Sequence, residues 1–172
     1  MQRAVFFDRD GVVNTRILGG YVTKWGEFEW MPDVGATLQQ IKDLGYLAII
    51  ITNQRGVGIG KMTGADLDAI HERMQTELMR EFGVRFDDII SCTDATNDSV
   101  RRKPAPTMLF EARDKWGIDL ARSYFVGDSP SDIEAGHRAG TKTVFLLNDH
   151  EAAPEDADAQ IGSLSDLVGL LS

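Results

Sequence analysis

The chain has 172 residues, of which 42% are hydrophobic and 26% are charged, and its formal net charge is −9. This length predicts one domain, residues 1–172, with a full hydrophobic core. The negative charge argues against a nucleic-acid partner, since phosphate backbones are bound by basic patches. The longest fully apolar stretch, residues 47–51, is too short to span a membrane.

The N-terminal residues and the cysteine count predict a cytoplasmic protein. Asp8 and Asp10 stand where a signal peptide would need its apolar region. The single cysteine, Cys92, excludes an intrachain disulfide and fits a reducing compartment. An acidic surface without a long apolar helix face favours a monomer.

Apolar runs that alternate with helical patterns organise the chain. Runs of this kind, bounded by polar and turn residues, are typical of buried strands. We expect strands at residues 4–7, 46–51, 88–92, 123–126 and 142–147.

Helices are predicted between these strands. Residues 34–44 and 107–116 have helical spacing, and each segment is followed by a glycine. Capping boxes predict three further helices, beginning at Thr63, Ser131 and Ser163.

The alternation predicts an α/β fold, a three-layer α/β/α sandwich around a parallel sheet of about five strands. The strand at residues 4–7 is expected at the centre of the sheet. Two loops are longer than a connection needs, and such loops are often functional. We name residues 15–32 the flap and residues 93–106 the specificity loop. Neither has room for a cap domain, and residues 148–160 are expected to be a surface loop.

Polar clusters lie at or just beyond the predicted strand ends. In a parallel sheet these ends converge on one edge. Clustered carboxylates repel one another and lose solvation unless a cation or a proton relieves them. The pair Asp8 and Asp10 therefore indicates a metal site with a carboxylate nucleophile. The other clusters are residues 52–54, 102–104 and 127–132.

These clusters resemble the motifs of the haloacid dehalogenase-like phosphatase superfamily. The motifs occur in the superfamily's order: Asp-x-Asp-Gly-x-x-Asn from Asp8, an apolar strand ending in Thr52, Lys103-Pro104, and Gly-Asp-x-x-x-Asp from Gly127. Residues 20–22, 52–56 and 102–104 are similar to the branch that contains histidinol-phosphate phosphatase and heptose 1,7-bisphosphate phosphatase. That branch has no cap domain, in agreement with the loop lengths.

The resemblance implies roles for four acidic residues. Asp8 would be the nucleophile that forms an aspartyl-phosphate, and Asp10 would be the general acid and base. Asp8, the main-chain carbonyl of Asp10 and Asp128 would hold Mg²⁺, a cation that prefers oxygen ligands. Asp132 would lie behind these ligands without binding the metal itself.

The resemblance also implies how the substrate is held. Thr52 would bind phosphoryl oxygens, and Lys103 would neutralise charge on the transferring group. Asn53, Arg102 and Tyr21 would contact the substrate.

Zinc is not expected. Members of the heptose branch often carry a zinc loop of cysteines and a histidine before Arg-Lys-Pro. Here Cys92 stands at the first ligand position, but residues 93–101 contain no Cys or His. A single thiolate cannot form a structural zinc site. Ser129 also stands where close relatives tend to have lysine.

The resemblance implies a small phosphorylated metabolite as substrate. Heptose 1,7-bisphosphate is the first choice, and histidinol phosphate or another sugar phosphate is the alternative. A receiver-like signalling protein, whose phosphorylated aspartate switches conformation, is the alternative from another class. Asp10 separates the two classes, because a receiver needs no acid or base two residues after its phosphoacceptor.

Other conspicuous side chains are predicted to have structural roles. The flap aromatics Trp25, Phe28 and Trp30 are expected to pack against the fold. His71, His150 and Arg101 are expected at the surface, while Cys92 and His137 are expected to be structural.

Overall fold

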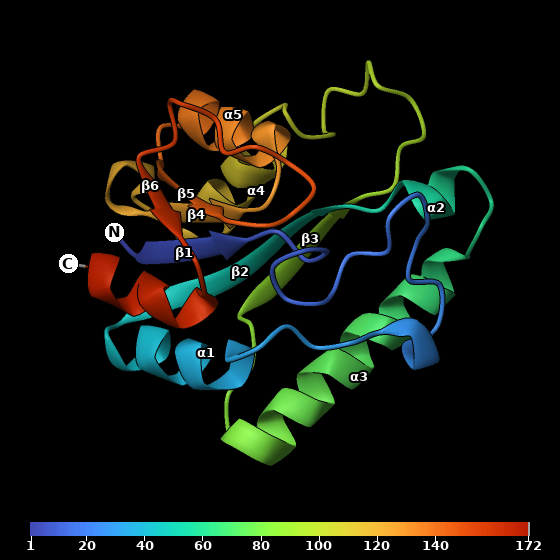
Figure 1. The fold of residues 1–172 in the computed structure, drawn as a ribbon, viewed down its shortest axis with the longest axis horizontal. Coiled ribbons are helices and arrows are strands. Elements are labelled where there is room, and N and C mark those ends of the chain that lie inside the picture. Colours follow the sequence, from blue (N-terminus) through green and yellow to red (C-terminus); the bar gives the residue numbers. More distant parts are fainter. Residues whose placement is uncertain (172) are drawn as a thin grey trace.

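Six strands form one parallel sheet in the computed structural model, which describes residues 1–171 (Figure 1). The strand order across the sheet is β3-β2-β1-β4-β5-β6, so β1 lies inside the sheet as predicted. The strands are β1 (Arg3–Phe7), β2 (Tyr46–Asn53), β3 (Asp88–Cys92), β4 (Tyr124–Gly127), β5 (Lys142–Leu146) and β6 (Ala159–Ile161).

Helices cover both faces of the sheet, which confirms the three-layer α/β prediction (Figure 1). Five are α-helices: α1 (Val34–Asp43), α2 (Arg55–Gly58), α3 (Gly64–Phe82), α4 (Thr107–Trp116) and α5 (Pro130–Ala139). Three are short 3-10 helices: η1 (Trp25–Glu27), η2 (Leu120–Arg122) and η3 (Leu164–Leu170).

The alternation of side chains along β1 divides the core into two halves. Val5 and Phe7 face the layer formed by α1, α3 and η3. Ala4 and Phe6 face the opposite layer, formed by α4 and α5. All four side chains are at most 2% exposed. Because both faces are covered here, residues 4–7 of β1 are all apolar and buried, whereas Arg3, at the start of the strand, is partly exposed. Asp8 follows directly where the strand ends.

The flap is anchored on α3. The Trp25 and Phe28 rings stack with centroids 4.6 Å apart, and Trp30 packs edge-on against Phe28. The Trp30 Nε1 donates to Glu77 on α3 at 3.1 Å, and the Arg73 guanidinium lies over the Trp25 ring. These contacts confirm that the flap aromatics pack and fix the base of the flap.

Two details of the C-terminal half differ from the sequence prediction. The expected loop at residues 148–160 contains the start of β6, so the sheet has six strands rather than five. Asp158, just before β6, accepts hydrogen bonds from the main chain and hydroxyl of Thr143 on β5, which holds this short strand in register.

None of the helices in the described part of the chain has the length and hydropathy of a membrane-spanning segment.

The capping prediction for α5 was also wrong. The capping residue is Ser129 rather than Ser131, and its partner is Asp132. Pro130 occupies the first turn, where its missing N–H has no helical partner to lose. The capping boxes at Thr63 and Ser163 are confirmed, although the last helix, η3, is of the 3-10 type.

Candidate active site

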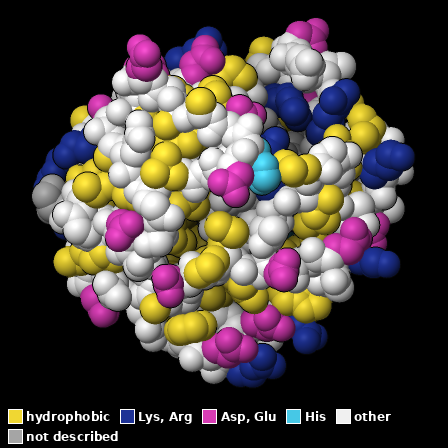
Figure 2. All heavy atoms as spheres, in the orientation of Figure 1, with side chains coloured by type: hydrophobic (Ala, Val, Ile, Leu, Met, Phe, Trp, Pro, Cys, Tyr) yellow, Lys and Arg dark blue, Asp and Glu magenta, His cyan; other side chains and the backbone are white. Residues whose placement is uncertain are grey.

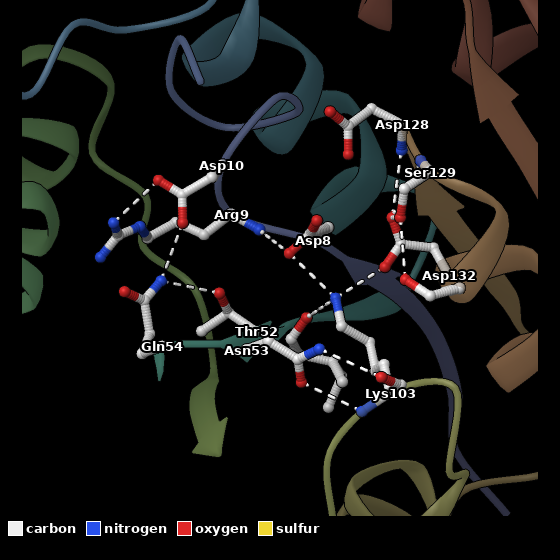
Figure 3. A network of polar contacts seen from close by, with 12 residues as sticks. Asp8, Arg9, Asp10, Thr52, Asn53, Gln54, Lys103, Asp128, Ser129 and Asp132 are labelled. Atoms are coloured by element: carbon white, nitrogen blue, oxygen red, sulfur yellow. Dashed lines mark hydrogen bonds and ion pairs between the residues drawn. The ribbon is translucent and has the colours of Figure 1, made fainter. Parts of the chain in front are cut away.

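The ends of β1, β2 and β4 bring the predicted polar clusters to one edge of the sheet (Figure 3). Phe7, the last residue of β1, pairs with Ile50 of β2 and Val126 of β4. The residues that follow these positions therefore meet around Asp8. Lys103 reaches the same place from the specificity loop (Figure 3).

Lys103 lies at the centre of this cluster and is 4% exposed. Its Nζ lies 3.0 Å from Asp8 Oδ1 and 2.6 Å from Asp132 Oδ1, and it donates to the main-chain carbonyl of Ile51 at 3.0 Å. Burial lowers the pKa of the Lys103 ammonium, but the charges of Asp132 and Asp8 outweigh burial and raise it above the ordinary value. Lys103 therefore stays charged at any physiological pH.

Asn53 and Thr52, at the end of β2, support this arrangement. The Asn53 side chain accepts from the Lys103 main-chain N–H at 3.0 Å and donates to the Lys103 carbonyl at 3.2 Å. The Thr52 hydroxyl is buried and accepts from Gln54 Nε2 at 2.9 Å. Asn53 thus holds the backbone that carries Lys103.

Both carboxylate oxygens of Asp10 are fixed by hydrogen bonds (Figure 3). Oδ1 accepts from Arg9 Nη2 at 2.9 Å and from Asn14 Nδ2 at 3.0 Å, and Oδ2 accepts from Gln54 Nε2 at 2.9 Å. Burial opposes ionisation of Asp10. The Arg9 charge and the three hydrogen bonds outweigh burial and hold the pKa of Asp10 below its ordinary value.

Asp8, Asp128 and Asp132 offer carboxylate oxygens that all lie within 4.8 Å of one another. Burial and the neighbouring Asp132 charge raise the pKa of Asp8 well above its ordinary value and that of Asp128 to about 6. Asp128 Oδ1 is buried without a hydrogen-bond partner. The crowded charge and the unpaired oxygen fit a cation bound between Asp8 and Asp128.

Asp132 has less capacity for a metal, because both of its oxygens are already engaged. Oδ1 is paired with Lys103, and Oδ2 accepts from the main-chain N–H groups of Asp128 and Ser129 and from the Ser129 hydroxyl. Asp132, the partner of Ser129 in the capping box of α5, therefore also orients Lys103 and the Asp128 backbone.

The glycine after Asp10 permits the close approach of Asp128. Gly11 has φ +95°, and a Cβ built there would lie 1.8 Å from Asp128 Oδ2. Any side chain at this position would collide with Asp128, so the glycine in Asp-x-Asp-Gly has a steric reason.

The cluster opens into a cavity of about 370 Å³ between the flap and the specificity loop. Beside the acidic residues it is lined by Tyr21 and by three arginines, Arg16, Arg55 and Arg102. Arg16 Nη1 lies 3.6 Å from Asp128 Oδ2, and Arg102 Nη1 is buried without a partner. In the space-filling view, basic side chains gather over α2 and the specificity loop (Figure 2). The cavity suits an anion in a chain whose overall charge is negative.

Sequence reasoning missed several residues of this site. Gln54 belongs to the predicted cluster at residues 52–54 but was given no role of its own, and Arg55 and Arg16 were not proposed as site residues. Arg9 is fully buried, and His71, expected at the surface, is 8% exposed. His71 Nε2 lies 3.2 Å from Arg9 Nη1, a contact between α3 and the segment after β1 that no local pattern reveals. Arg101, by contrast, is held outside the cavity by a salt bridge to Glu111.

Comparison with known proteins identifies the class. A model of the haloacid dehalogenase-like hydrolases matches residues 12–140. The chain therefore belongs to this hydrolase family, which confirms the resemblance seen in its motifs.

Named relatives are phosphatases. The chain is 39% identical over 145 residues to D-glycero-beta-D-manno-heptose-1,7-bisphosphate 7-phosphatase of Rhodopseudomonas palustris, covering 80% of this chain and 79% of that protein. It is 35% identical over 167 residues to D-glycero-alpha-D-manno-heptose-1,7-bisphosphate 7-phosphatase of Photorhabdus laumondii, covering 92% of this chain and 90% of that protein. The fold is similar to the structure of D,D-heptose 1,7-bisphosphate phosphatase from B. bronchiseptica complexed with magnesium and phosphate, with a TM-score of 0.89. The two sequences are 26% identical, and the match covers 98% of this chain and 97% of that one. The chain is thus a phosphatase of the haloacid dehalogenase-like family.

The raised pKa of Asp128 predicts a pH-dependent gain in stability when this carboxyl is removed. A carboxyl with a raised pKa binds its proton more tightly in the folded state, so its ionisation destabilises the fold as pH rises through about 6. In EDTA, Asp128→Asn is expected to raise the free energy of unfolding by about 1–3 kcal/mol at about pH 7.5, and by much less at about pH 4. Urea unfolding at the two pH values measures the difference.

Asp68→Asn, at an exposed position on α3, is the matched control and should change stability little at either pH. A loss of stability in Asp128→Asn at the higher pH would show that burial and the charge of Asp132 do not destabilise the ionised Asp128 carboxylate.

Proposed function

We propose that this phosphatase is a Mg²⁺-dependent enzyme that hydrolyses D-glycero-D-manno-heptose 1,7-bisphosphate through an aspartyl-phosphate. One observation carries the proposal: the carboxylate of Asp8 stands against the Lys103 ammonium at the floor of an arginine-lined cavity. The family assignment favours this hydrolase over the receiver-like alternative.

Asp8 is the proposed nucleophile. One of its oxygens attacks the phosphorus atom, and the bond between phosphorus and the leaving alcohol oxygen breaks. Lys103, 3.0 Å from Asp8 Oδ1, offsets the repulsion between this carboxylate and the anionic phosphoryl group. Asn53 keeps Lys103 in place through its two main-chain hydrogen bonds. Thr52 is proposed to bind a phosphoryl oxygen.

Asp10 is the proposed acid and base. It protonates the leaving alkoxide, then removes a proton from the water that releases phosphate from Asp8. The free site favours the ionised form of Asp10, whose pKa is lowered by Arg9 and its hydrogen bonds. A phosphate anion beside Asp10 would raise this pKa, and the protonated form needed for the first step becomes accessible in the complex.

Mg²⁺ is proposed to bind Asp8, Asp128 and the main-chain carbonyl of Asp10. The partnerless Oδ1 of Asp128 and the raised pKa values of Asp8 and Asp128 support this choice, because a cation relieves both. When bound, the ion supplies positive charge that stabilises the phosphoryl oxygens in the transition state. Asp132 is proposed to stay outside the ligand set, since Lys103 and main-chain amides use its oxygens.

The arginines around the cavity support a substrate with a second phosphate. Lys103 is committed to Asp8 and Asp132, whereas Arg55 and Arg102 have no carboxylate partner among the residues described. A guanidinium group suits a phosphate because it offers several donors in one plane. We propose that these two side chains bind the phosphate that is not cleaved, while Tyr21 flanks the sugar. Both the alpha and the beta heptose bisphosphates occur in the names of relatives.

This arrangement predicts a selective loss in binding. Arg55→Gln is expected to raise KM for the bisphosphate by ~10-fold, the value of one charge-assisted hydrogen bond, and to change KM for the heptose 7-phosphate little. Steady-state kinetics on the two substrates measure the ratio. The control is Arg122→Gln, which replaces an exposed arginine outside this cavity, and it should change neither KM. Equal losses on both substrates would show that Arg55 does not contact the second phosphate.

Phosphate release from a panel of substrates tests the proposed function. The panel contains the alpha and beta heptose bisphosphates, histidinol phosphate and other sugar phosphates, each assayed with Mg²⁺ or EDTA. One heptose bisphosphate with kcat/KM well above the others, and activity lost in EDTA, supports the proposal. Preference for histidinol phosphate, or even activity across the panel, overturns the heptose assignment.

A further inference from the structure

A buried polar connection runs from Asp10 into helix α3. Arg9 is 0% exposed, and its Nη2 donates to Asp10 Oδ1 at 2.9 Å. Its Nη1 lies 3.2 Å from Nε2 of His71, which comes from the middle of α3 and is 8% exposed. His71 does not itself line the cavity, and its hydrogen bond with Arg9 links it with the site.

The contact defines the protonation state of His71. A guanidinium group only donates hydrogen bonds, so His71 Nε2 must accept and the ring proton must lie on Nδ1. Burial and the adjacent Arg9 charge lower the pKa of His71 to about 3, in agreement with a neutral ring. The imidazole thus serves as a fixed acceptor.

Arg9 depends on this acceptor. Its Nε is buried without a hydrogen-bond partner, so the side-chain contacts that orient the guanidinium are those to Asp10 and His71. An apolar residue at position 71 would leave Nη1 unpaired as well. A buried donor without a partner is unfavourable by about 1–3 kcal/mol, which the guanidinium could relieve only by turning away from its present position.

We propose that His71 is a positioning residue for Asp10 that acts through Arg9. The proposal rests on the proposed role of Asp10 as acid and base. Transfer of a proton to the leaving oxygen requires the carboxyl group at hydrogen-bond distance, so a small rotation of Asp10 reduces the rate. Helix α3 also carries Arg73 and Glu77, which hold the flap. Helix α3 therefore positions both the flap and, through Arg9, the carboxyl group of Asp10.

Leaving-group dependence tests this role. An alkyl phosphate needs protonation of its leaving oxygen, whereas 4-nitrophenyl phosphate releases a stable anion and needs the acid far less. His71→Leu is expected to lower kcat/KM by ~10-fold on the heptose bisphosphate and by less than ~3-fold on the aryl phosphate. His71→Gln offers an amide oxygen to Arg9 and should restore most of the loss.

Two comparisons separate positioning from general destabilisation. In an Asp10→Asn background, His71→Leu should cause no further loss on the heptose bisphosphate, because the group it positions is absent. Ile70→Val, a buried change on the same helix, should lower Tm slightly without any dependence on the leaving group.

Equal losses on the two substrates, or an undiminished loss in the Asp10→Asn background, would overturn the role of His71 while leaving the phosphatase intact. Failure of the wild type to hydrolyse either substrate would instead overturn the proposed function, and the role of His71 with it.

Discussion

Asp8→Asn is expected to abolish phosphate release, lowering kcat by at least ~10⁴-fold, the size of effect seen when a covalent nucleophile is removed. An amide oxygen is a far weaker nucleophile than a carboxylate and cannot form the acyl phosphate. The fold should persist, because the change relieves the repulsion among Asp8, Asp128 and Asp132 that raises the pKa of Asp8. Phosphate release and thermal unfolding, measured on the same preparation, check both parts.

Asp8→Glu tests whether the position of the carboxylate matters for catalysis as well as its charge. It keeps the carboxylate but moves it by one methylene, and a displacement of about 1 Å at a reacting atom can lower the rate by ~10²-fold. Activity close to wild type in Asp8→Asn would contradict the assignment of the nucleophile. Activity close to wild type in Asp8→Glu would show that the position of the carboxylate is not critical.

Lys103→Met is expected to lower both activity and stability. The change leaves Asp8 and Asp132 without the ammonium that lies 3.0 Å and 2.6 Å from them. Removal of one partner from a buried ion pair is unfavourable by about 3–5 kcal/mol, and we expect a loss of that size in the free energy of unfolding at neutral pH without Mg²⁺. Loss of charge at the transferring group should lower kcat by ~10²–10³-fold. Urea unfolding and steady-state kinetics measure the two effects.

Lys115→Met is the matched control for stability. Lys115 Nζ lies 2.8 Å from Asp88, but its side chain is 59% exposed. Its loss should lower the free energy of unfolding by less than about 1 kcal/mol and leave kcat unchanged. Similar losses in the two variants would mean that Lys103 does not stabilise the buried carboxylates.

Most of the fold followed from local patterns. Residues 4–7 of the strand that precedes Asp8 are all apolar because both faces of the sheet are covered there, and this makes the end of the strand easy to locate. The segment at β6 gave no such signal, since it is three residues long and follows a run rich in Ala, Asp and Glu. Its pairing depends on Asp158 contacts with β5, which are tertiary.

The α5 cap shows a second limit of sequence patterns. Two overlapping serine patterns, from Ser129 and from Ser131, both satisfy the capping rule. Asp132 selects the first, because its Oδ2 accepts from the Ser129 main chain and hydroxyl while its Oδ1 binds Lys103. The contacts of Asp132 in the site, and not the sequence pattern of the helix, therefore determine which serine caps α5.

The site itself divides in the same way. Motif residues near strand ends, such as Asp8, Asp10 and Asp128, could be placed from the sequence, because the carboxyl ends of parallel strands lie at the same edge of the sheet. Arg9 and His71 could not be placed, because a basic residue between two acidic ones and a histidine in a polar helix are ordinary surface patterns. Their burial depends on the packing of α3 against the turn after β1.

Trapping of the phosphorylated enzyme tests directly whether Asp8 is the nucleophile. Excess enzyme is mixed with ³²P-labelled substrate and Mg²⁺ and is quenched in acid, using wild type, Asp8→Asn and Asp10→Asn. We expect label on the peptide that contains Asp8, discharge of that label by hydroxylamine, slower decay in Asp10→Asn, and no label in Asp8→Asn. Label on a peptide without Asp8, or complete turnover with no labelled protein in either wild type or Asp10→Asn, would contradict it.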